Sequence, residues 1–419
     1  MTEILPFKGI LYNISKVSIE AVLAPPYDII TSEYKDVLYK RSPFNIVRID
    51  YGKDMPGDNQ TNNKYTRARK YLETWLYEDV LIQSKKPSFY IYAMTYDVNG
   101  QKKQLVGFLG LLRLEELGSG SIYPHECTYS TPKQDRLNLL RSCDANISPI
   151  FSLYKSTEGK VSALFSKIIQ SKPYIETKDA DGALHRLWQV DKKKDITVIK
   201  KELEDKPIFI ADGHHRYETA LEYQREMRRK KSSGKGKAPS DYVLMFFSNM
   251  FDEGLTILPT HRLVKEIPDD IEKMLPEFFE IEIVNEDFDI ARKMSGLKNV
   301  FGFFKNDSNQ WYILHLKQDL LRDVSPNIRE IDVFILHDVV LKRILHVTDI
   351  DYEMDTHRAL EKVKKGKFEA VFFLNPTKVE DVEKAALSLM RMPPKSTYFY
   401  PKLLTGVVIN SFSHSDVSG

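Results

Sequence analysis

The sequence predicts a mixed α/β protein of the α+β kind, and three observations support this. The chain has 419 residues, more than one ordinary hydrophobic core holds, so we expect at least two regions. Residues 88–116 alternate between apolar and polar side chains around Asn99-Gly100, which is typical of a β-hairpin. Residues 207–229 begin as a short apolar strand and continue at once with helical periodicity.

The first region is expected to span residues 1–240. Apolar residues at helical spacing predict a helix within 62–82, ahead of the hairpin. Further along the region, the patterns predict a helix from 132 to about 142, a buried strand at 149–154, a helix at 157–170, two short strands between 174 and 190, and the strand and helix of 207–229.

The second region is expected to span residues 241–419. Strands are predicted within 241–264, and helices and strands alternate from 268 to 317. The remaining elements are predicted at 331–344 (helix), 355–364 (helix), 369–374 (strand) and 378–391 (helix). We expect the C-terminal segment 392–402 to return to the site of the first region.

Composition and charge narrow the classes of partner. The net charge is +2, so the chain lacks the electrostatic footprint of a nucleic-acid-binding protein, and the basic run 228–237 is typical of a solvated loop. Two cysteines cannot form a disulfide framework and do not have zinc-knuckle spacing. With no signal-peptide pattern and no apolar run near the roughly 20 residues of a membrane span, a cytoplasmic protein without membrane association is expected.

The strongest candidate site lies where the strand of 207–211 passes through Asp212-Gly213 into a helix. This order places His214, His215 and Arg216 in the first turn, where backbone amides lack helical partners and the helix dipole is positive. Such a turn binds anions, and Gly213 allows a phosphate to approach the backbone. Arg216 offers a bidentate fork to phosphate oxygens.

Two other interpretations of this segment compete with phosphate binding. The first is a plain N-cap at Asp212 or Gly213 with exposed histidines, but three potential cations at a helix N-terminus are unfavourable without an anion. The second is a metal site formed by His214 and His215. Neighbours on a helix point about 100° apart and rarely share an ion, so no metal ligand is assigned.

Two further segments contain reactive residue types. His125-Glu126 offers a carboxylate for general-base work, with a surface loop as the alternative interpretation. Near the C-terminus, four residues combine positive charge with hydroxyl groups and suit phosphate binding, although packing alone would also account for them: Lys395, Ser396, Thr397 and Lys402. Four polar residues are candidates for substrate contacts: Asp28, His125, Arg136 and Asn146.

Five ordered motifs together resemble the family called domain of unknown function 1015. They are Ala24-Pro-Pro-Tyr-Asp28, Pro124-His-Glu126, Ala211-Asp-Gly-His-His-Arg-Tyr-Glu-Thr-Ala220, Leu258-Pro-Thr-His-Arg262 and Met392-Pro-Pro-Lys-Ser-Thr-Tyr-Phe-Tyr-Pro-Lys402. More distantly, Pro-His-Glu followed by Asp-Gly-His-His-Arg is similar to the ParB/sulfiredoxin-like superfamily and, within it, to free-serine kinases. That resemblance implies a ParB/sulfiredoxin-like mixed-sheet core in the first region.

The resemblance also implies roles for individual residues. Glu126 would remove the proton from an acceptor hydroxyl, and Asp212 would orient a histidine or position a metal ion. The phosphates would be bound by Gly213, His214, His215 and Arg216, with Lys395 or Lys402 adding charge. The expected ligands are ATP or ADP with Mg²⁺, because phosphoryl transfer needs positive charge around the transferring group.

The resulting hypothesis is a nucleotide-dependent kinase acting on a small hydroxylated metabolite, with serine as the leading candidate. Two alternatives stay open. One is a ParB-like switch that binds or slowly hydrolyses nucleotide. The other is a phosphatase or related hydrolase that uses the same anion site.

Overall fold

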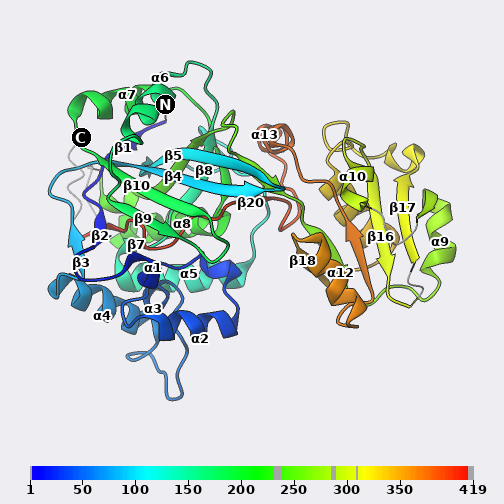
Figure 1. The fold of residues 1–419 in the computed structure, drawn as a ribbon, viewed down its shortest axis with the longest axis horizontal. Helices are drawn as coiled ribbons and strands as arrows, with labels where there is room; N and C mark the ends of the chain where they lie inside the picture. Colours follow the sequence, from blue (N-terminus) through cyan, green and yellow to red (C-terminus); the bar gives the residue numbers. More distant parts are fainter. Residues whose placement is uncertain (1, 231–236, 285–288, 308–309, 414–419) are drawn as a thin grey trace. The chain divides into compact units, whose positions relative to one another are not determined.

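The fold is mixed α/β, as the sequence predicted. The computed structural model describes residues 2–230, 237–284, 289–307 and 310–413, so most of the basic run 228–237 lies outside the described residues. The chain forms two compact units, drawn as ribbons in Figure 1. The first comprises Met1–Tyr123, Thr128–Leu255 and Pro401–Gly419, and the second comprises Pro124–Cys127 and Thr256–Tyr400.

The first unit is built on a nine-stranded sheet of order β6-β11-β8-β12-β5-β4-β10-β9, with β1 paired to β5. Its strands are β1 (Ile4–Leu5), β4 (Phe89–Val98), β5 (Gln101–Arg113), β6 (Ile122–Tyr123), β8 (Ile150–Tyr154), β9 (Ile175–Lys178), β10 (Leu184–Val190), β11 (Ile208–Asp212) and β12 (Tyr242–Asn249). Two small pairs accompany them, β2 (Ile10–Tyr12) with β3 (Leu81–Gln83) and β7 (Ala145–Asn146) with β21 (Asn410–Ser411).

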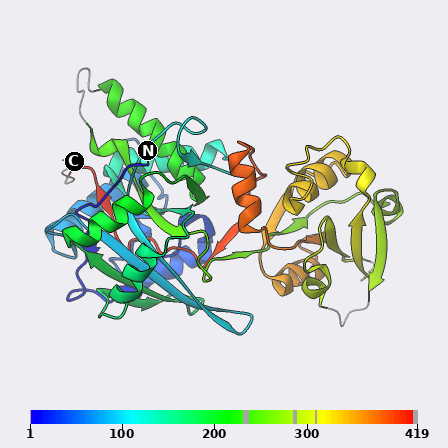
Figure 2. The same cartoon turned by 90° about the horizontal axis from the view of Figure 1, so that it is seen from above.

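The predicted hairpin is confirmed as β4 and β5. The two strands run antiparallel, and Figures 1 and 2 show them side by side. Asn99 and Gly100 have φ of 53° and 75°, the left-handed conformation that a two-residue hairpin turn requires and that this residue pair tolerates best.

The helices of the first unit include those that the sequence predicted. They are α1 (Ile19–Val22), α2 (Ser32–Arg41), α3 (Val47–Asp50), α4 (Lys64–Tyr77), α5 (Ser130–Cys143), α6 (Lys160–Ile168), α7 (Lys193–Leu203) and α8 (His214–Lys230), with 3-10 turns at Tyr27–Ile29 and Pro239–Asp241. In Figure 1, α6 and α7 lie on one side of this unit and α2 to α4 on the other. Ala68, Leu72 and Trp75 are buried on α4, as its periodicity predicted.

The two faces of the sheet are covered differently. On one face, alternate residues of β4 such as Phe89 and Ile91 pack in a single core with side chains from α6, α7 and α8. On the other face, the C-terminal segment crosses the strands, and the amide of Leu404 donates to the Tyr92 hydroxyl at 3.5 Å. Gly9 fits beside this segment because a Cβ there would lie 2.4 Å from the Val408 side chain. This packing explains why residues after Tyr400 belong to the first unit.

The two units do not coincide with the expected division after residue 240. β12 begins at Tyr242 and lies between β5 and β8 in the first unit's sheet. Its residues are buried almost throughout, as expected of a strand covered on both faces. A boundary before β12 would remove an inner strand, so the first unit continues to Leu255.

The second unit has an antiparallel six-stranded sheet of order β15-β17-β16-β19-β14-β18. These strands are β14 (His261–Val264), β15 (Phe279–Val284), β16 (Val300–Lys305), β17 (Gln310–Leu316), β18 (Ile350–Glu353) and β19 (Ala370–Phe373), and β13 (Thr256–Leu258) pairs with β20 (Tyr398–Tyr400). The helices are α9 (Ile271–Phe278), α10 (Ile290–Met294), α11 (Asp332–Phe334), α12 (Thr356–Lys364) and α13 (Val379–Leu387).

The helix predicted at 331–344 has an unexpected geometry. After α11 it continues as a π-helical segment over Ile335–Ile344, preceded in this unit by a 3-10 turn at Gln318–Leu321. Among the described residues, no helix is both long enough and apolar enough to cross a membrane.

Candidate functional site

The turn between β11 and α8 is built around Gly213. Its φ is 95°, which a residue with a side chain rarely adopts, and a Cβ at this position would lie 2.9 Å from Nε of Arg216. The helical ladder starts at once, because the amide of Tyr217 donates to the Gly213 carbonyl at 3.0 Å. Tyr217, Ala220 and Leu221 are buried and form the inward face of α8, which agrees with the helical periodicity predicted within 207–229.

Asp212 connects two cations at this turn. Its Oδ2 lies 2.8 Å from Nη2 of Arg216, and its Oδ1 lies 3.2 Å from Nζ of Lys402. The Arg216 fork is held further by a hydrogen bond from Nη1 to the Pro149 carbonyl. Lys402, one of the C-terminal residues expected at the site, therefore lies beside the start of α8.

The two histidines have different surroundings. His214 is buried. His215 stacks on the Tyr129 ring, and its Nε2 accepts a hydrogen bond from the Tyr129 amide at 2.8 Å. An accepting nitrogen carries no proton, so the ring is neutral in this arrangement and only its Nδ1 can donate. The expected donation from His215 to phosphate is thereby limited to Nδ1.

A small polar cavity of about 50 Å³ lies in the first unit, lined in part by Arg216. Its polar lining residues include Asp50 at the end of α3, Arg136 on α5 and Asn146 on β7. Asp50 Oδ1 and Arg136 Nη1 form a buried ion pair at 3.1 Å. Within the part of the chain that the structure describes, Asp50 Oδ2 and Arg216 Nε are buried without a hydrogen-bond partner. Such atoms normally bind water or a polar ligand group.

Electrostatic interactions connect the Ala24-Pro-Pro-Tyr-Asp28 motif to this cavity. The Arg136 guanidinium lies 4.0 Å from the centre of the Tyr27 ring. Burial raises the pKa of Tyr27 to about 12 against the opposing charge of Arg136, and the neighbouring Asp28 carboxylate adds to the rise. Burial also raises the pKa of Asp50, an effect that Arg136 and Arg216 oppose. Tyr27 thus brings the motif into contact with the cavity's ion pair.

The Asn146 side chain has a structural role beside this cavity. Its Oδ1 accepts hydrogen bonds from the Leu244 amide and from Nδ2 of Asn410, both at 3.1 Å. The side chain therefore joins β12 to the C-terminal segment. Of the four residues expected to contact the substrate, Arg136 and Asn146 line the cavity. The charge of Asp28 contributes to the raised pKa of Asp50, another lining residue.

The remaining candidates belong to the second unit. His125 is fully buried, and its Nε2 lies 3.1 Å from Oγ1 of Thr397. Oε1 of Glu126 accepts a hydrogen bond from the Lys395 amide at 2.8 Å, and the Ser396 hydroxyl donates to the Pro393 carbonyl at 2.6 Å. These bonds connect 124–127 to 392–397, so the expected phosphate contacts of Ser396 and Thr397 compete with structural hydrogen bonds.

Asp212 does not fit the role of metal ligand that the resemblance implies. Both of its oxygens are engaged by cations, Arg216 on one side and Lys402 on the other. Throughout the described ranges, no group of three or more His, Cys, Asp or Glu side chains could hold a metal ion.

Sequence reasoning missed Asp50 and Tyr27. Asp50 is the last residue of the short helix α3, where a single carboxylate carries no signal of its own, and its partner Arg136 is 86 residues away. Tyr27 lies inside a motif that the sequence does single out, but two prolines before it indicate only a rigid loop. Contact with Arg136 is a tertiary property in both cases.

Comparisons with known proteins give one clear result. A family model described as "Protein of unknown function (DUF1015)" matches residues 4–334. A search of curated proteins finds no match.

Three solved structures are similar to this chain at low TM-scores. A conserved hypothetical protein from Pyrococcus furiosus has 14% identity and a TM-score of 0.33, covering 68% of this chain and 89% of its own. A free serine kinase variant in complex with ADP has 13% identity and a TM-score of 0.35, covering 67% and 84%. C-terminally truncated SbnI from Staphylococcus aureus has 10% identity and a TM-score of 0.37, covering 71% and 85%.

Proposed function

The chain belongs to the DUF1015 family, whose description assigns no activity, and from its own residues we propose a nucleotide-dependent phosphotransferase that binds phosphate at the start of α8. The observation that carries this proposal is the Gly213 turn. It places the first-turn amides of α8 beside two cations, Arg216 and Lys402, that share a single carboxylate.

The charges at this turn favour an anion. Arg216 and Lys402 contribute two positive charges and Asp212 one negative charge, which leaves a net charge of +1. The N-terminus of a helix adds a partial positive charge of roughly half a unit and amides without helical partners. A phosphate group accepts hydrogen bonds from helix-start amides as water does, and in addition offsets the positive charge.

Residues of the turn have distinct roles in the proposal. Gly213 keeps the backbone open to a phosphate oxygen, and the amides of residues 214–216 donate to it. Lys402 contributes a mobile point charge, whereas the Arg216 fork is positioned by Asp212 and the Pro149 carbonyl. His214 is also proposed to contact the phosphates, as the sequence motif predicted.

The proposed acceptor is a small hydroxylated metabolite, with serine as the leading candidate. A hydroxyl group is both a donor and an acceptor of hydrogen bonds. The hydroxyl of the acceptor could donate a hydrogen bond to Asp50 Oδ2 and accept one from Arg216 Nε, two buried atoms that lack a partner in the described residues. This match supports an alcohol as the acceptor and makes Asp50 a positioning residue for it.

Glu126 is the proposed general base, carried over from the resemblance. Its carboxylate takes the proton of the acceptor hydroxyl, and the acceptor oxygen forms a bond to the terminal phosphorus of the nucleotide. The bond between that phosphorus and the bridging oxygen breaks, which yields the phosphorylated acceptor and a nucleotide shorter by one phosphate. For this role Glu126 must exchange its hydrogen bond from the Lys395 amide for one from the acceptor.

The test begins with melting temperatures of the full chain in the presence of ATP, ADP or AMP with Mg²⁺, followed by acceptor screening with the best binder. A ligand that binds the folded state raises the melting temperature by mass action. We expect Arg216→Ala to abolish the shift, and Glu126→Gln to keep the shift but lose acceptor-dependent turnover.

Three outcomes would replace the proposal. If no nucleotide changes the melting temperature and Arg216→Ala behaves like the wild type, α8 does not bind nucleotide. Hydrolysis that ignores the acceptor indicates a ParB-like switch. Phosphate release from a phosphorylated metabolite without nucleotide indicates a phosphatase.

A further inference from the structure

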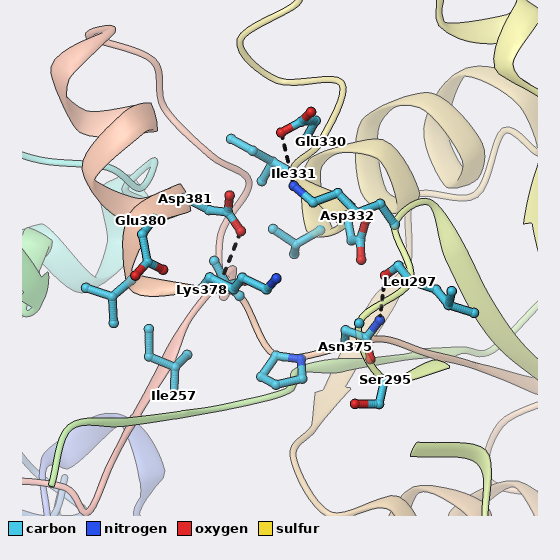
Figure 3. A pocket seen from close by; sticks show the side chains of 16 residues that line it. Ile257, Ser295, Leu297, Glu330, Ile331, Asp332, Asn375, Lys378, Glu380 and Asp381 are labelled. Atoms are coloured by element: carbon cyan, nitrogen blue, oxygen red, sulfur yellow. Dashed lines mark hydrogen bonds and ion pairs between the residues drawn. The ribbon is translucent and has the colours of Figure 1, made fainter. Parts of the chain in front are cut away.

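The second unit contains a larger cavity, of about 360 Å³, that no motif of the sequence indicated. Three segments line it, at 295–298 before β16, at 330–333 around the start of α11, and at 375–381 between β19 and α13. Its volume is within the range of small-molecule sites, about 300–1,000 Å³. Figure 3 shows the side chains of Asp332, Lys378 and Asp381 directed into it.

Hydrogen bonds hold the three lining segments in place. The side-chain Nδ2 of Asn375 donates to the carbonyls of Met294 and Leu297 at 2.8 and 3.0 Å. The Asp332 carboxylate accepts a hydrogen bond from the Asn299 amide at 2.8 Å. The cavity is therefore formed before any ligand arrives, which lowers the entropic cost of binding.

The charges of the lining residues indicate what the cavity accepts. The lining contains two lysines, Lys298 and Lys378. It also contains four carboxylates, so its net charge is −2: Glu330, Asp332, Glu380 and Asp381. Lys298 and Glu330 pair with each other at 3.1 Å. Lys378 is the second positive group near Asp332 and Asp381, and the charge of Lys298 also opposes the rise in the pKa of both carboxyl groups. This set repels phosphates but suits a ligand with an ammonium group and a carboxylate.

The buried carboxyl groups favour a cationic group in the same place. Burial raises the pKa of Asp332 to about 6, and the charge of Asp381 adds to the rise. Burial likewise raises the pKa of Asp381. A carboxylate in such surroundings gains more from a bound ammonium group than a solvated one does, because the lining still carries a net negative charge.

The cavity also has an apolar wall that suits the hydrocarbon part of a ligand. Ile257 contributes hydrocarbon surface in front of the buried Ile331 and Val333, and Leu297 exposes 45% of its surface. A large apolar side chain left in water at a cavity is covered when a ligand with its own apolar part binds. The lining therefore combines an acidic region, lysine side chains and an apolar wall.

We propose that this cavity binds a small zwitterionic metabolite of the free amino acid class, with its ammonium group at Asp332 and Asp381 and its carboxylate at Lys378. The hydrocarbon side chain of the ligand packs on Ile257 and Leu297. This site belongs entirely to the second unit and is separate from the phosphate site at α8. It does not depend on the proposed phosphotransferase activity.

The experiment is calorimetric titration of the full chain with glycine, serine, leucine, lysine and glutamate. Two truncated probes separate the ligand groups, since isobutylamine lacks the carboxylate of an amino acid and isovalerate lacks the amine. We expect at least one amino acid to bind, and each truncated probe to bind about tenfold more weakly or not at all. The panel therefore tests both charged groups of the proposed ligand.

Variants assign the binding to this cavity. Lys378→Ala and Asp332→Asn should each weaken the best amino acid by about tenfold. Lys365→Ala, an exposed ion-paired lysine on the same unit, should leave it unchanged, and so should Arg216→Ala at the phosphate site. The inference is overturned if no amino acid binds, or if binding survives in both cavity variants. Loss of binding in Arg216→Ala alone would also overturn it.

Discussion

The Asp212 carboxylate pairs with Lys402 at 3.2 Å although 190 residues separate them in the sequence. The pair attaches the C-terminal segment to the turn that starts α8. Because Arg216 uses the other oxygen of the same carboxylate, Asp212 holds two cations together. Their mutual repulsion is offset by one negative charge only, which makes the turn receptive to a second anion.

Lys402→Ala should weaken nucleotide binding by about tenfold or more, because a hydrogen bond to a charged group contributes roughly 1.5–3 kcal/mol. Stability should fall by only about 1 kcal/mol, since Asp212 keeps Arg216 as its partner. Titration of nucleotide and urea unfolding measure the two effects. Lys206→Ala is the matched control, as Lys206 is also a partly buried lysine, paired with Glu202 at 2.6 Å. Equal nucleotide affinity in both variants would remove Lys402 from the site.

Gly213→Ala should lose nucleotide binding as well as about 1–2 kcal/mol of stability. A methyl group would meet Arg216 Nε at 2.9 Å, at a φ of 95° that strains any side chain. Gly159→Ala provides the control, because its φ is 69° and its Cβ would meet nothing within 4 Å. Both variants should unfold more easily, but only Gly213→Ala should fail to bind nucleotide. If Gly159→Ala also fails, the binding defect reflects stability alone.

Asp50→Asn should destabilise the first unit by about 3 kcal/mol, because it leaves a buried guanidinium without one of its charge partners. Arg136 keeps Asp135, at 2.9 Å from Nε, which limits the loss. Urea unfolding measures it. Asp191→Asn removes an exposed partner of Lys86 and should cost below about 1 kcal/mol. Similar losses in the two variants would show that the Asp50–Arg136 pair contributes no more than a surface ion pair.

The second unit should lose stability as the pH falls from about 6.5 towards about 4. Burial lowers the pKa of His261 from 6.5 to about 4, with the charge of Arg262 adding to the effect. The unfolded chain therefore binds a proton that the folded unit does not, which costs about 3 kcal/mol at the acidic end. The folded ring is neutral, since its Nδ1 accepts the Leu374 amide at 3.2 Å.

His261→Gln should flatten this part of the pH dependence, measured by hydrogen exchange of second-unit peptides between pH 7.5 and 5. The Asp332 carboxyl, with its pKa raised to about 6, favours folding at lower pH. It acts equally in wild type and variant, so their difference isolates His261. His357→Gln, at an exposed histidine of the same unit, is the control and should keep the wild-type slope. An unchanged slope in His261→Gln would contradict the prediction.

The sequence by itself determined the local elements. Asn99-Gly100 predicted the hairpin because two residues that tolerate left-handed φ are enough to reverse the chain. The apolar run ending at Ala211, followed by Gly213 and the spacing of Tyr217, Ala220 and Leu221, predicted the strand, turn and helix of the phosphate site. These signals act over a few residues, and they need no knowledge of the rest of the chain.

Only the tertiary structure decided the partners of the charged residues. It pairs Asp50 with Arg136 and Asp212 with Lys402, and it assigns Glu126 to a different unit from α8. It also places β12 inside the first unit's sheet and forms the cavity at Asp332 and Lys378 from three distant segments. Charged side chains carry no periodic signal of their partner, because an ion pair depends on where the packed core brings two segments together, and that is decided by burial over the whole unit.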